Sequence, residues 1–527
     1  MARATPLKPT PATPTRLAGG LTDDQVLVLL AVGAGVVYAL LGLTHTGFYQ
    51  QDEAAHYIDM RAFWYDPNRI LYNWNKVGYK LLYALPALLG PKFVLLFNAA
   101  VAGLTVWVTG QAGKAYGLKS SLLPALLLAT QPFWVMLAFR NYAELPSALL
   151  FALAVWQHLK GRYLWAALAA GYALLLRQEA IPIMGLYGLW LLYRRQWWSA
   201  VVLALPPLLH HVWGWLATGD ALFLVHQLLG DSAKTQDAWP RQGFNHYFLL
   251  SLTIFGAFAL TGFVAWVGLA ARKAVSLAKA WPIVLPAVLY FLLHCLFNLQ
   301  EPKVGPSTGG NLRYIIAISP LVALLAAEAY SQTATSQAWR VSLGLVGAFG
   351  LLVALYMTYA HNFIVLTEVR SYQPLGLVVL AGVVLFLPLG DSARLWTVGV
   401  LSGFFLLATV RFPPQTEEEK LTRQVARQLK PQLLERPFFA TNQLLYYYMD
   451  RPAASLPQAT TAMSDSLFLA APKGTWVVWD SHYSHRPALN PRSVPHTWFL
   501  ERPKDFKLIQ QHITPDQRFG ILVFEKQ

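Results

Sequence analysis

The stretch FYQQDEAAHYIDM, at residues 48–60, brings together several side chains that can take up protons or bind cations. Asp52 and Glu53 are adjacent, and in a helix His56 and Tyr57 would follow one turn later on the same faces. A carboxylate here can act as a general base or ligate a divalent cation. A solvated helix cap is the alternative, but the adjacent pair and the amphipathic stretch that follows favour function. We therefore expect Asp52 and Glu53 to be catalytic and His56 and Tyr57 to bind substrate.

A second acidic position follows in FRNYAELP, where Arg140, Tyr142 and Glu144 lie between two apolar runs that are joined by almost no loop. Glu144 has an alternative structural role, because Pro146 suits the first turn of a helix and a carboxylate is favourable at its positive end. The sequence leaves both roles open. We expect all three side chains to contact substrate.

Two further arginines lie at the ends of apolar runs. Arg177 and Glu179 occur in LLLRQEAIPIM, where they could instead form an internal ion pair that fixes helix packing. Lys303 lies in a Gly-rich loop, and Arg313 follows it at the start of an apolar run. A phosphate requires fixed cationic donors, and arginine offers a planar fork of N–H groups. Carboxylates and arginines at one membrane face predict chemistry on a phospholipid-like donor.

The composition indicates which elements hold these residues. Of the 527 residues, 55% are hydrophobic and 13% are charged, which is about half the charged fraction of an average soluble domain. Apolar runs of roughly 17–22 residues recur, and each is long enough to cross about 30 Å of hydrocarbon. We expect an all-α polytopic membrane domain of about 13 spans. The predicted spans are 25–43, 92–110, 121–137, 145–159, 164–176, 180–193, 197–216, 247–270, 283–299, 313–330, 341–360, 373–390 and 396–411.

Charge predicts the orientation of these spans. The net charge of +15 comes from Lys and Arg spread over short loops, which indicates the positive-inside rule rather than nucleic-acid binding. The basic loops are therefore expected in the cytoplasm, and the longer loops of mixed charge outside. An odd number of spans places the C-terminus outside as well. The first apolar run has no cleavage site after it and is expected to be retained.

The character of the chain changes near residue 412. PPQTEEEKLTRQVARQLKPQLLE predicts an amphipathic helix, and short β-like runs follow at 437–441, 475–480 and 519–526. LLYYYM and FKLIQQHI are predicted to be helical. We expect a disordered cytoplasmic tail at 1–20, a transmembrane domain at 21–411 and a small external α/β domain at 412–527.

These features resemble the GT-C superfamily, integral-membrane glycosyltransferases that use polyprenyl-phosphate sugars. QDEAAHY is similar to the Asp-Glu motif of mannosyltransferases in glycolipid-anchor and N-glycan assembly. It also occupies the place of the acidic motif in protein O-mannosyltransferases and the bacterial aminoarabinose transferase. NYAELP matches the second-loop acidic position, and GGNLRYIIAISPLVALLAA resembles the Arg-aromatic start of a late span in the mannosyltransferases. Gly310, Asn311 and Leu312 stand where those mannosyltransferases often have His-Lys-Glu.

The resemblance implies an inverting displacement at the external face of the plasma membrane. Asp52 by preference, or Glu53, would take the proton from an acceptor hydroxyl on a lipid, a glycan or a protein. The acceptor would attack the anomeric carbon while polyprenyl phosphate leaves. Arg313 and Lys303, with an arginine of the earlier loops, would neutralise that phosphate. Relatives that transfer single sugars often work without a metal. If a divalent metal such as Mg²⁺ or Mn²⁺ takes part, Asp52 and Glu144 are its expected ligands.

Two other classes of membrane protein fit part of the pattern. A secondary transporter would also place charges at membrane depth, but it should show two similar halves and interrupted helices, and we find no internal repeat. A polysaccharide polymerase or ligase would also use polyprenyl-linked sugars, but it usually relies on a large external loop late in the chain. Release of polyprenyl phosphate from a sugar-bearing donor separates these classes.

Overall fold

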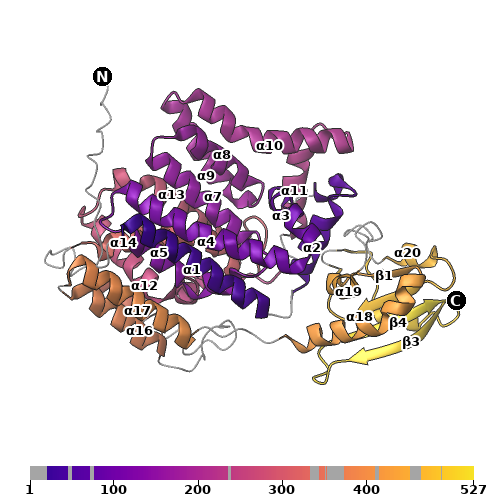
Figure 1. Cartoon of the computed structure of the whole chain (residues 1–527). Helices are drawn as coiled ribbons and strands as arrows, with labels where there is room; N and C mark the ends of the chain where they lie inside the picture. The colour runs from indigo at the N-terminus through magenta and orange to yellow at the C-terminus, as the bar shows by residue number, and fades with distance from the viewer. Residues whose placement is uncertain are drawn as a thin grey trace.

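The computed structural model describes residues 21–44, 50–71, 76–235, 239–332, 344–350, 352, 373–387, 389–409, 415–450, 464–487 and 490–527. The predicted tail at 1–20, most of the predicted span at 341–360 and the predicted domain boundary at 411/412 lie outside these residues. Helices form most of the described chain, and a four-stranded sheet lies near its C-terminus (Figure 1).

Apolar helices pack side by side into a bundle, as the apolar runs predict (Figure 1). Within the described residues, six segments are long and apolar enough to cross a membrane, judged by length and composition. They are α1 (Asp23–Thr44), α4 (Pro91–Tyr116), α10 (Trp197–Thr218), α12 (His246–Ala271), α13 (Leu277–Phe297) and the segment Leu312–Tyr330. Further helices of the bundle are α7 (Glu144–Leu159), α8 (Tyr163–Leu174), α9 (Ile181–Tyr193), α16 (Gln373–Phe386) and α17 (Asp391–Thr409).

Several apolar runs are not single regular helices. The run at 121–137 divides into α5 (Leu122–Ala129) and α6 (Pro132–Leu137), because Pro132 cannot donate to the preceding turn and instead begins a new helix. The run at 313–330 starts as the 3₁₀ helix η4 (Leu312–Ile318) and continues as α14 (Ser319–Tyr330). α12 is kinked at Gly256, whose φ of 76° side chains with a Cβ rarely adopt.

The segment between α1 and α4 contains short helices. These are α2 (Gln51–Ala62), η1 (Pro67–Ile70) and α3 (Val77–Leu89). α2 begins after Gln50, whose backbone N–H donates to the Glu53 carboxylate (3.3 Å), as in a capping box. α3 is absent from the predicted spans because Lys80 and the following Gly90-Pro91 leave only a short apolar run. α2 packs against α3 and so lies at the end of the bundle where α4 begins.

The opposite end of the bundle carries basic loops. Lys114, near the end of α4, pairs with Asp24 at the start of α1 (2.6 Å), and Lys119 pairs with Asp391 at the start of α17 (3.3 Å). α4 has 26 residues, and at 1.5 Å per residue it is about 39 Å long. The acidic helix α2 and the basic loop 114–119 are therefore separated by roughly the thickness of a membrane.

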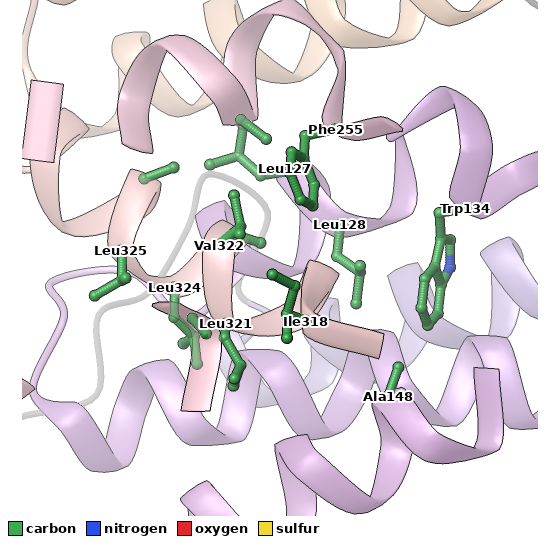
Figure 2. Packing of buried hydrophobic residues seen from close by; sticks show 14 of the residues in the cluster. Leu127, Leu128, Trp134, Ala148, Phe255, Ile318, Leu321, Val322, Leu324 and Leu325 are labelled. Atoms are coloured by element: carbon green, nitrogen blue, oxygen red, sulfur yellow. The ribbon is translucent and has the colours of Figure 1, made fainter. Parts of the chain in front are cut away.

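The largest hydrophobic core surrounds α14, which is buried along its whole length. Figure 2 shows Leu321, Val322 and Leu324 of α14 close to Leu127 and Leu128 of α5. A helix that is buried all round cannot rotate or slide without opening cavities in the core. Because η4 continues directly into α14, this core fixes the position of the residues in η4.

The C-terminal domain is a small α/β unit. Its sheet has the strand order β1-β2-β4-β3, with β1 parallel to β2 and the other neighbours antiparallel. The strands are β1 (Phe438–Ala440), β2 (Trp476–Asp480), β3 (Phe506–Ile513) and β4 (Gly520–Lys526). The helices are α18 (Glu417–Glu435), α19 (Gln443–Met449), α20 (Asp465–Leu469) and α21 (His496–Leu500). The predicted fold class, a polytopic helical domain followed by a small α/β domain, is confirmed.

One predicted element of this domain is wrong. FKLIQQHI, predicted to be helical, is strand β3. It pairs antiparallel with β4 from Phe506 to Ile513, with a bulge between Leu508 and Gln510. Pairing with a distant strand overrides the local helical pattern, and the sequence of β3 alone does not reveal that partner.

The C-terminal domain docks on α2 (Figure 1). Ile58 belongs to a hydrophobic cluster whose other members lie in the C-terminal domain. Tyr57 packs edge-to-face against Tyr447 of α19 (5.8 Å between ring centroids), and Arg61 pairs with Asp450 (3.4 Å). The acidic helix is thus held between the bundle and the C-terminal domain.

Candidate active site

Asp52 and Glu53, adjacent in α2, have opposite environments. Glu53 is fully buried, and Arg140 donates from Nε to its Oε1 (2.8 Å) and from a terminal nitrogen to its Oε2. The backbone N–H of Asn141 also donates to Oε1 (3.0 Å). The side chain of Asp52 is 40% exposed and accepts a hydrogen bond from Arg313 (2.6 Å). Of the predicted catalytic pair, Asp52 is therefore the carboxylate that a substrate can reach.

Glu53 joins the first acidic loop to the second. The side-chain amide of Asn141 donates to the backbone carbonyl of Glu53 (2.8 Å), and the Tyr79 hydroxyl donates to Asn141 Oδ1 (2.5 Å). A buried ion pair is tolerated only when its atoms are well hydrogen-bonded. Here the pair of Glu53 with Arg140 fixes the loop before α7 against α2.

A chain of alternating charges extends from Asp52 into the bundle. Arg177 donates to Glu144 Oε1 (3.0 Å) and to Glu179 Oε1 (3.0 Å). Arg313 Nε lies 3.6 Å from the same Oε1 of Glu144, which is fully buried at the start of α7. The charges therefore alternate from Asp52 through Arg313, Glu144 and Arg177 to Glu179. The internal ion pair considered for Arg177 and Glu179 is present, and it includes Glu144.

Aromatic rings cover the faces of the two arginines. The Arg313 guanidinium lies 4.4 Å from the ring centroid of Tyr142 and 5.4 Å from that of Tyr314. The Arg177 guanidinium lies 4.4 Å from the ring centroid of Tyr314. A guanidinium that stacks on a ring keeps its N–H groups available at the edge. These rings thus restrict the orientation of both guanidinium groups. The Tyr142 hydroxyl in turn donates a hydrogen bond to the side chain of Gln50.

Lys76 is a member of the site that the sequence analysis did not identify. It precedes α3 in a left-handed conformation (φ 52°). Burial lowers the pKa of its ammonium to about 8, Glu144 opposes this shift, and Arg177 and Arg313 add to it. These neighbours place Lys76 beside the charge chain. In YNWNKVGYK it has the pattern of an ordinary interfacial lysine, and the positive φ of its backbone cannot be predicted from the residue types.

A second buried ion cluster supports α2 from behind. Asp59 accepts from Arg69 Nε (3.1 Å) and from Lys80 Nζ (3.1 Å), and the Asp59 and Lys80 side chains are almost completely buried. The cluster ties α2 to η1 and α3, which fixes the rotation of α2. That rotation decides which side of the helix Asp52 and Glu53 face.

Three further residues predicted to bind substrate are His56, Tyr57 and Lys303. His56 is buried with its ring edge against Tyr79, and burial together with Lys80 holds the pKa of its imidazole well below the usual range. Tyr57 faces the C-terminal domain. Lys303 is exposed in the segment between α13 and η4. Contact of these three with substrate stays a prediction.

The two possible metal ligands, Asp52 and Glu144, share a protein cation. Asp52 and Glu144 both contact the guanidinium of Arg313. Within the described residues, no group of three or more His, Cys, Asp or Glu side chains is arranged to hold a metal ion. The cation next to these two carboxylates is therefore the guanidinium of Arg313.

Comparison with known proteins identifies the fold. No family model and no curated protein matches the chain in sequence. Two crystal structures of ArnT from Cupriavidus metallidurans resemble it over 95% of this chain and 98% of theirs. The form bound to undecaprenyl phosphate matches with a TM-score of 0.56 at 16% identity, and the apo form with 0.57 at 15%. ArnT is a GT-C glycosyltransferase. The chain therefore has the GT-C fold, as its acidic first loop and its succession of apolar helices predict.

Proposed function

We propose that this protein is a membrane glycosyltransferase that moves a sugar from a polyprenyl-phosphate donor to an acceptor hydroxyl. The environment of Asp52 supports this proposal most directly. Its carboxylate is partly exposed, accepts a hydrogen bond from Arg313 and lies at the outer end of a buried charge chain. A carboxylate that can take a proton thus adjoins a cation that can take a phosphate. The GT-C fold and the polyprenyl lipid bound by ArnT support the same donor class.

The reaction is an in-line displacement with inversion. The acceptor oxygen forms a bond to the anomeric carbon, and its proton moves to a carboxylate oxygen of Asp52. The bond from the anomeric carbon to the phosphate oxygen breaks, and the electron pair stays on the phosphate. Because Glu53 already accepts from Arg140 and Asn141, we assign the base to Asp52 rather than to Glu53.

Cations close to Asp52 would stabilise the departing phosphate. The rings of Tyr142 and Tyr314 lie against the Arg313 guanidinium, so its position is largely fixed before a phosphate binds. A donor phosphate on Arg313 would compete with Asp52 for the guanidinium. Binding of the donor would thus release the Asp52 carboxylate from Arg313 and leave it free to accept the proton of the acceptor hydroxyl. Lys76 adds a second cation beside Glu144.

The remaining charged residues position these groups. Glu144 and Glu179 hold Arg177, and Glu144 also contacts Arg313. The site lies at the α2 end of the bundle, away from the basic loop that contains Lys114 and Lys119. By the positive-inside rule this end and the domain at 412–527 lie on the external side of the plasma membrane. The acceptor is a lipid, a glycan or a protein that is available there.

Turnover of a defined donor tests the function. Purified protein would be given undecaprenyl-phosphate sugars with a mixture of envelope acceptors, and free undecaprenyl phosphate would be measured by mass spectrometry. We expect release of undecaprenyl phosphate and a product that carries one added sugar. Intact donor after incubation with every acceptor fraction would refute the proposal, and products with several added sugars would identify a polymerase.

A further inference from the structure

The structure holds buried polar atoms that the proposed reaction does not use. Four of them have no hydrogen-bond partner within the described residues: Glu144 Oε2 and Arg313 Nε in the charge chain, and His294 Nε2 and Asn298 Oδ1 at the C-terminal end of α13. Glu144, His294 and Asn298 are fully buried. An unpaired buried polar atom destabilises the folded state, so these atoms indicate that a polar partner belongs beside them.

His294 presents a defined chemical group. Its Nδ1 lies 3.0 Å from the carbonyl oxygen of Tyr290 one turn earlier in α13. A carbonyl only accepts, so Nδ1 carries a proton, and in the neutral imidazole Nε2 is a hydrogen-bond acceptor. Asn298 follows one further turn along, and its amide N–H groups donate to the carbonyl of His294 (3.1 Å) and to Thr308 (2.9 Å), which leaves its oxygen as an acceptor.

His294 is close to the reacting groups. Its ring lies 4.5 Å from that of Tyr290 and 5.9 Å from that of Tyr314. The Tyr290 hydroxyl accepts from Arg177 (3.3 Å), and Arg177 binds Glu144. The ring of Tyr314 also covers Arg313, which binds Asp52. A continuous layer of contacts therefore leads from Asp52 to His294.

The unused atoms match one class of ligand. Glu144 Oε2, His294 Nε2 and Asn298 Oδ1 are all acceptors, so their partner must present several donors. The rings of Tyr290 and Tyr314 next to them offer apolar faces. A ring with several hydroxyl groups and apolar C–H faces has this combination, whereas the prenyl chain of the donor has no hydrogen-bond donors.

We propose that Glu144, His294 and Asn298 form the subsite for the hydroxyl groups of the donor sugar, and that His294 and Asn298 select among sugars. This inference rests on the proposed glycosyl transfer and adds the residues that recognise the hydroxyl groups of the sugar. A donor that lacks a hydroxyl opposite His294 would leave a buried acceptor unpaired, which makes such a site strongly selective.

The test compares donors that differ by one hydroxyl. We would measure kcat/KM of the wild type and of His294→Phe and Asn298→Leu with a panel of undecaprenyl-phosphate hexoses and pentoses and their deoxy analogues. The best wild-type donor should lose about 10- to 100-fold in each variant. One particular deoxy analogue should be poor with the wild type and lose almost nothing further in His294→Phe. His294→Gln, which keeps an acceptor, should recover part of the activity.

His158→Phe is the matched control. His158 is a partly buried histidine in α7 that lies among aromatic rings, including Trp190 (4.8 Å), and its substitution should leave donor selection unchanged. Binding of undecaprenyl phosphate without a sugar should be equal in wild type, His294→Phe and Asn298→Leu. Loss of that binding, or an equal loss of kcat/KM for every donor and analogue, would overturn the subsite and identify a structural role. A wild type that neither binds undecaprenyl phosphate nor turns over any donor would instead overturn the proposed function.

Discussion

The consequences of burial are clearest at Asp52 and Glu53. Both are acids in the same turn of α2, but Glu53 is enclosed by Arg140 and Asn141, whereas Asp52 is partly exposed and has one charged partner. An enclosed carboxylate with every oxygen engaged stabilises the fold and is a poor base. An exposed carboxylate on a single arginine can exchange that partner for a substrate. We therefore propose that Glu53 has a structural role and that Asp52 takes part in the chemistry.

Substitution of Glu53 tests this division. Glu53→Gln removes the charge that balances Arg140 in a buried pair, and breaking such a pair costs on the order of 3–5 kcal/mol. We expect a clear fall in the thermal unfolding temperature in detergent. Glu417→Gln, which removes an exposed acid paired with Lys420, should change it little. An unchanged unfolding temperature for Glu53→Gln would show that the pair with Arg140 is not needed for folding.

Arg313→Lys tests the phosphate-binding role of the fork. Lysine keeps the charge but cannot stack flat on Tyr142 and Tyr314 while donating from two parallel N–H groups. Loss of one charge-assisted hydrogen bond corresponds to about 1.5–3 kcal/mol. Affinity for undecaprenyl phosphate should therefore fall roughly 10- to 100-fold, with little change in unfolding temperature. Arg272→Lys, at the exposed end of α12, is the control. Equal affinity in Arg313→Lys and wild type would show that the paired N–H groups of Arg313 are not needed to bind the phosphate.

The residue types of the site were readable from sequence, but their pairing was not. Acids and arginines next to apolar runs stand out because charge is scarce in such segments. Which acid of the pair is buried depends on the rotation of α2, and that rotation is fixed by contacts with Arg69, Lys80 and Arg140 from other elements. His294 escaped notice because a single histidine in an apolar run resembles a core residue.

At the scale of elements, the site is built where helices begin or end. Asp52 lies in the first turn of α2, Glu144 in the first turn of α7, and Arg313 in η4 just before α14. Short connections leave these termini little freedom, and the buried α14 fixes η4 further. The apolar runs predicted most helices because length and hydropathy are local properties. They did not predict α3, because Lys80 interrupts its apolar run. The segment of β3 was predicted to be helical, because its pairing with the distant strand β4 is not a local property.

Helix α18 brings a titratable group to the same region. Burial raises the pKa of the Glu419 carboxyl to about 7, while its hydrogen bonds with Thr416 and the charge of Arg140 oppose the shift. The folded-state pKa lies above the ordinary value of 4.5. The stability contributed by protonated Glu419 is therefore fully present below about pH 4.5 and is lost as the pH rises through about 7.

Glu419→Gln should abolish this dependence, because glutamine keeps the capping-box geometry and has no charge. At pH 8 the variant should unfold at a higher temperature than the wild type, and the difference should disappear towards pH 4.5. Glu417→Gln, in the exposed first position of α18, should give a curve parallel to the wild type. A constant difference between Glu419→Gln and wild type from pH 5 to 8 would contradict the raised pKa.

In the whole molecule, the bundle separates the end that carries the charge chain from the end that carries the basic loops. Lys114 and Lys119 mark one end, and α2 with the docked C-terminal domain marks the other (Figure 1). We predict that tags at the N-terminus and between α12 and α13 report the cytoplasm and that a tag after residue 527 reports the outside. Labelling of single-cysteine variants in intact cells, with Cys295 replaced, measures this. A cytoplasmic C-terminus would place the site on the wrong side for an external acceptor.

In the proposed reaction Asp52 accepts the proton of the acceptor hydroxyl, and substitution of Asp52 tests this role. Asp52→Asn keeps the shape and a hydrogen-bond acceptor for Arg313 but cannot take the proton. Release of undecaprenyl phosphate from the best donor should fall by roughly 10²- to 10⁴-fold, while undecaprenyl phosphate still binds. Asp66→Asn, at an exposed acid before η1, should turn over normally. Turnover by Asp52→Asn within a few-fold of wild type would show that Asp52 is not the general base.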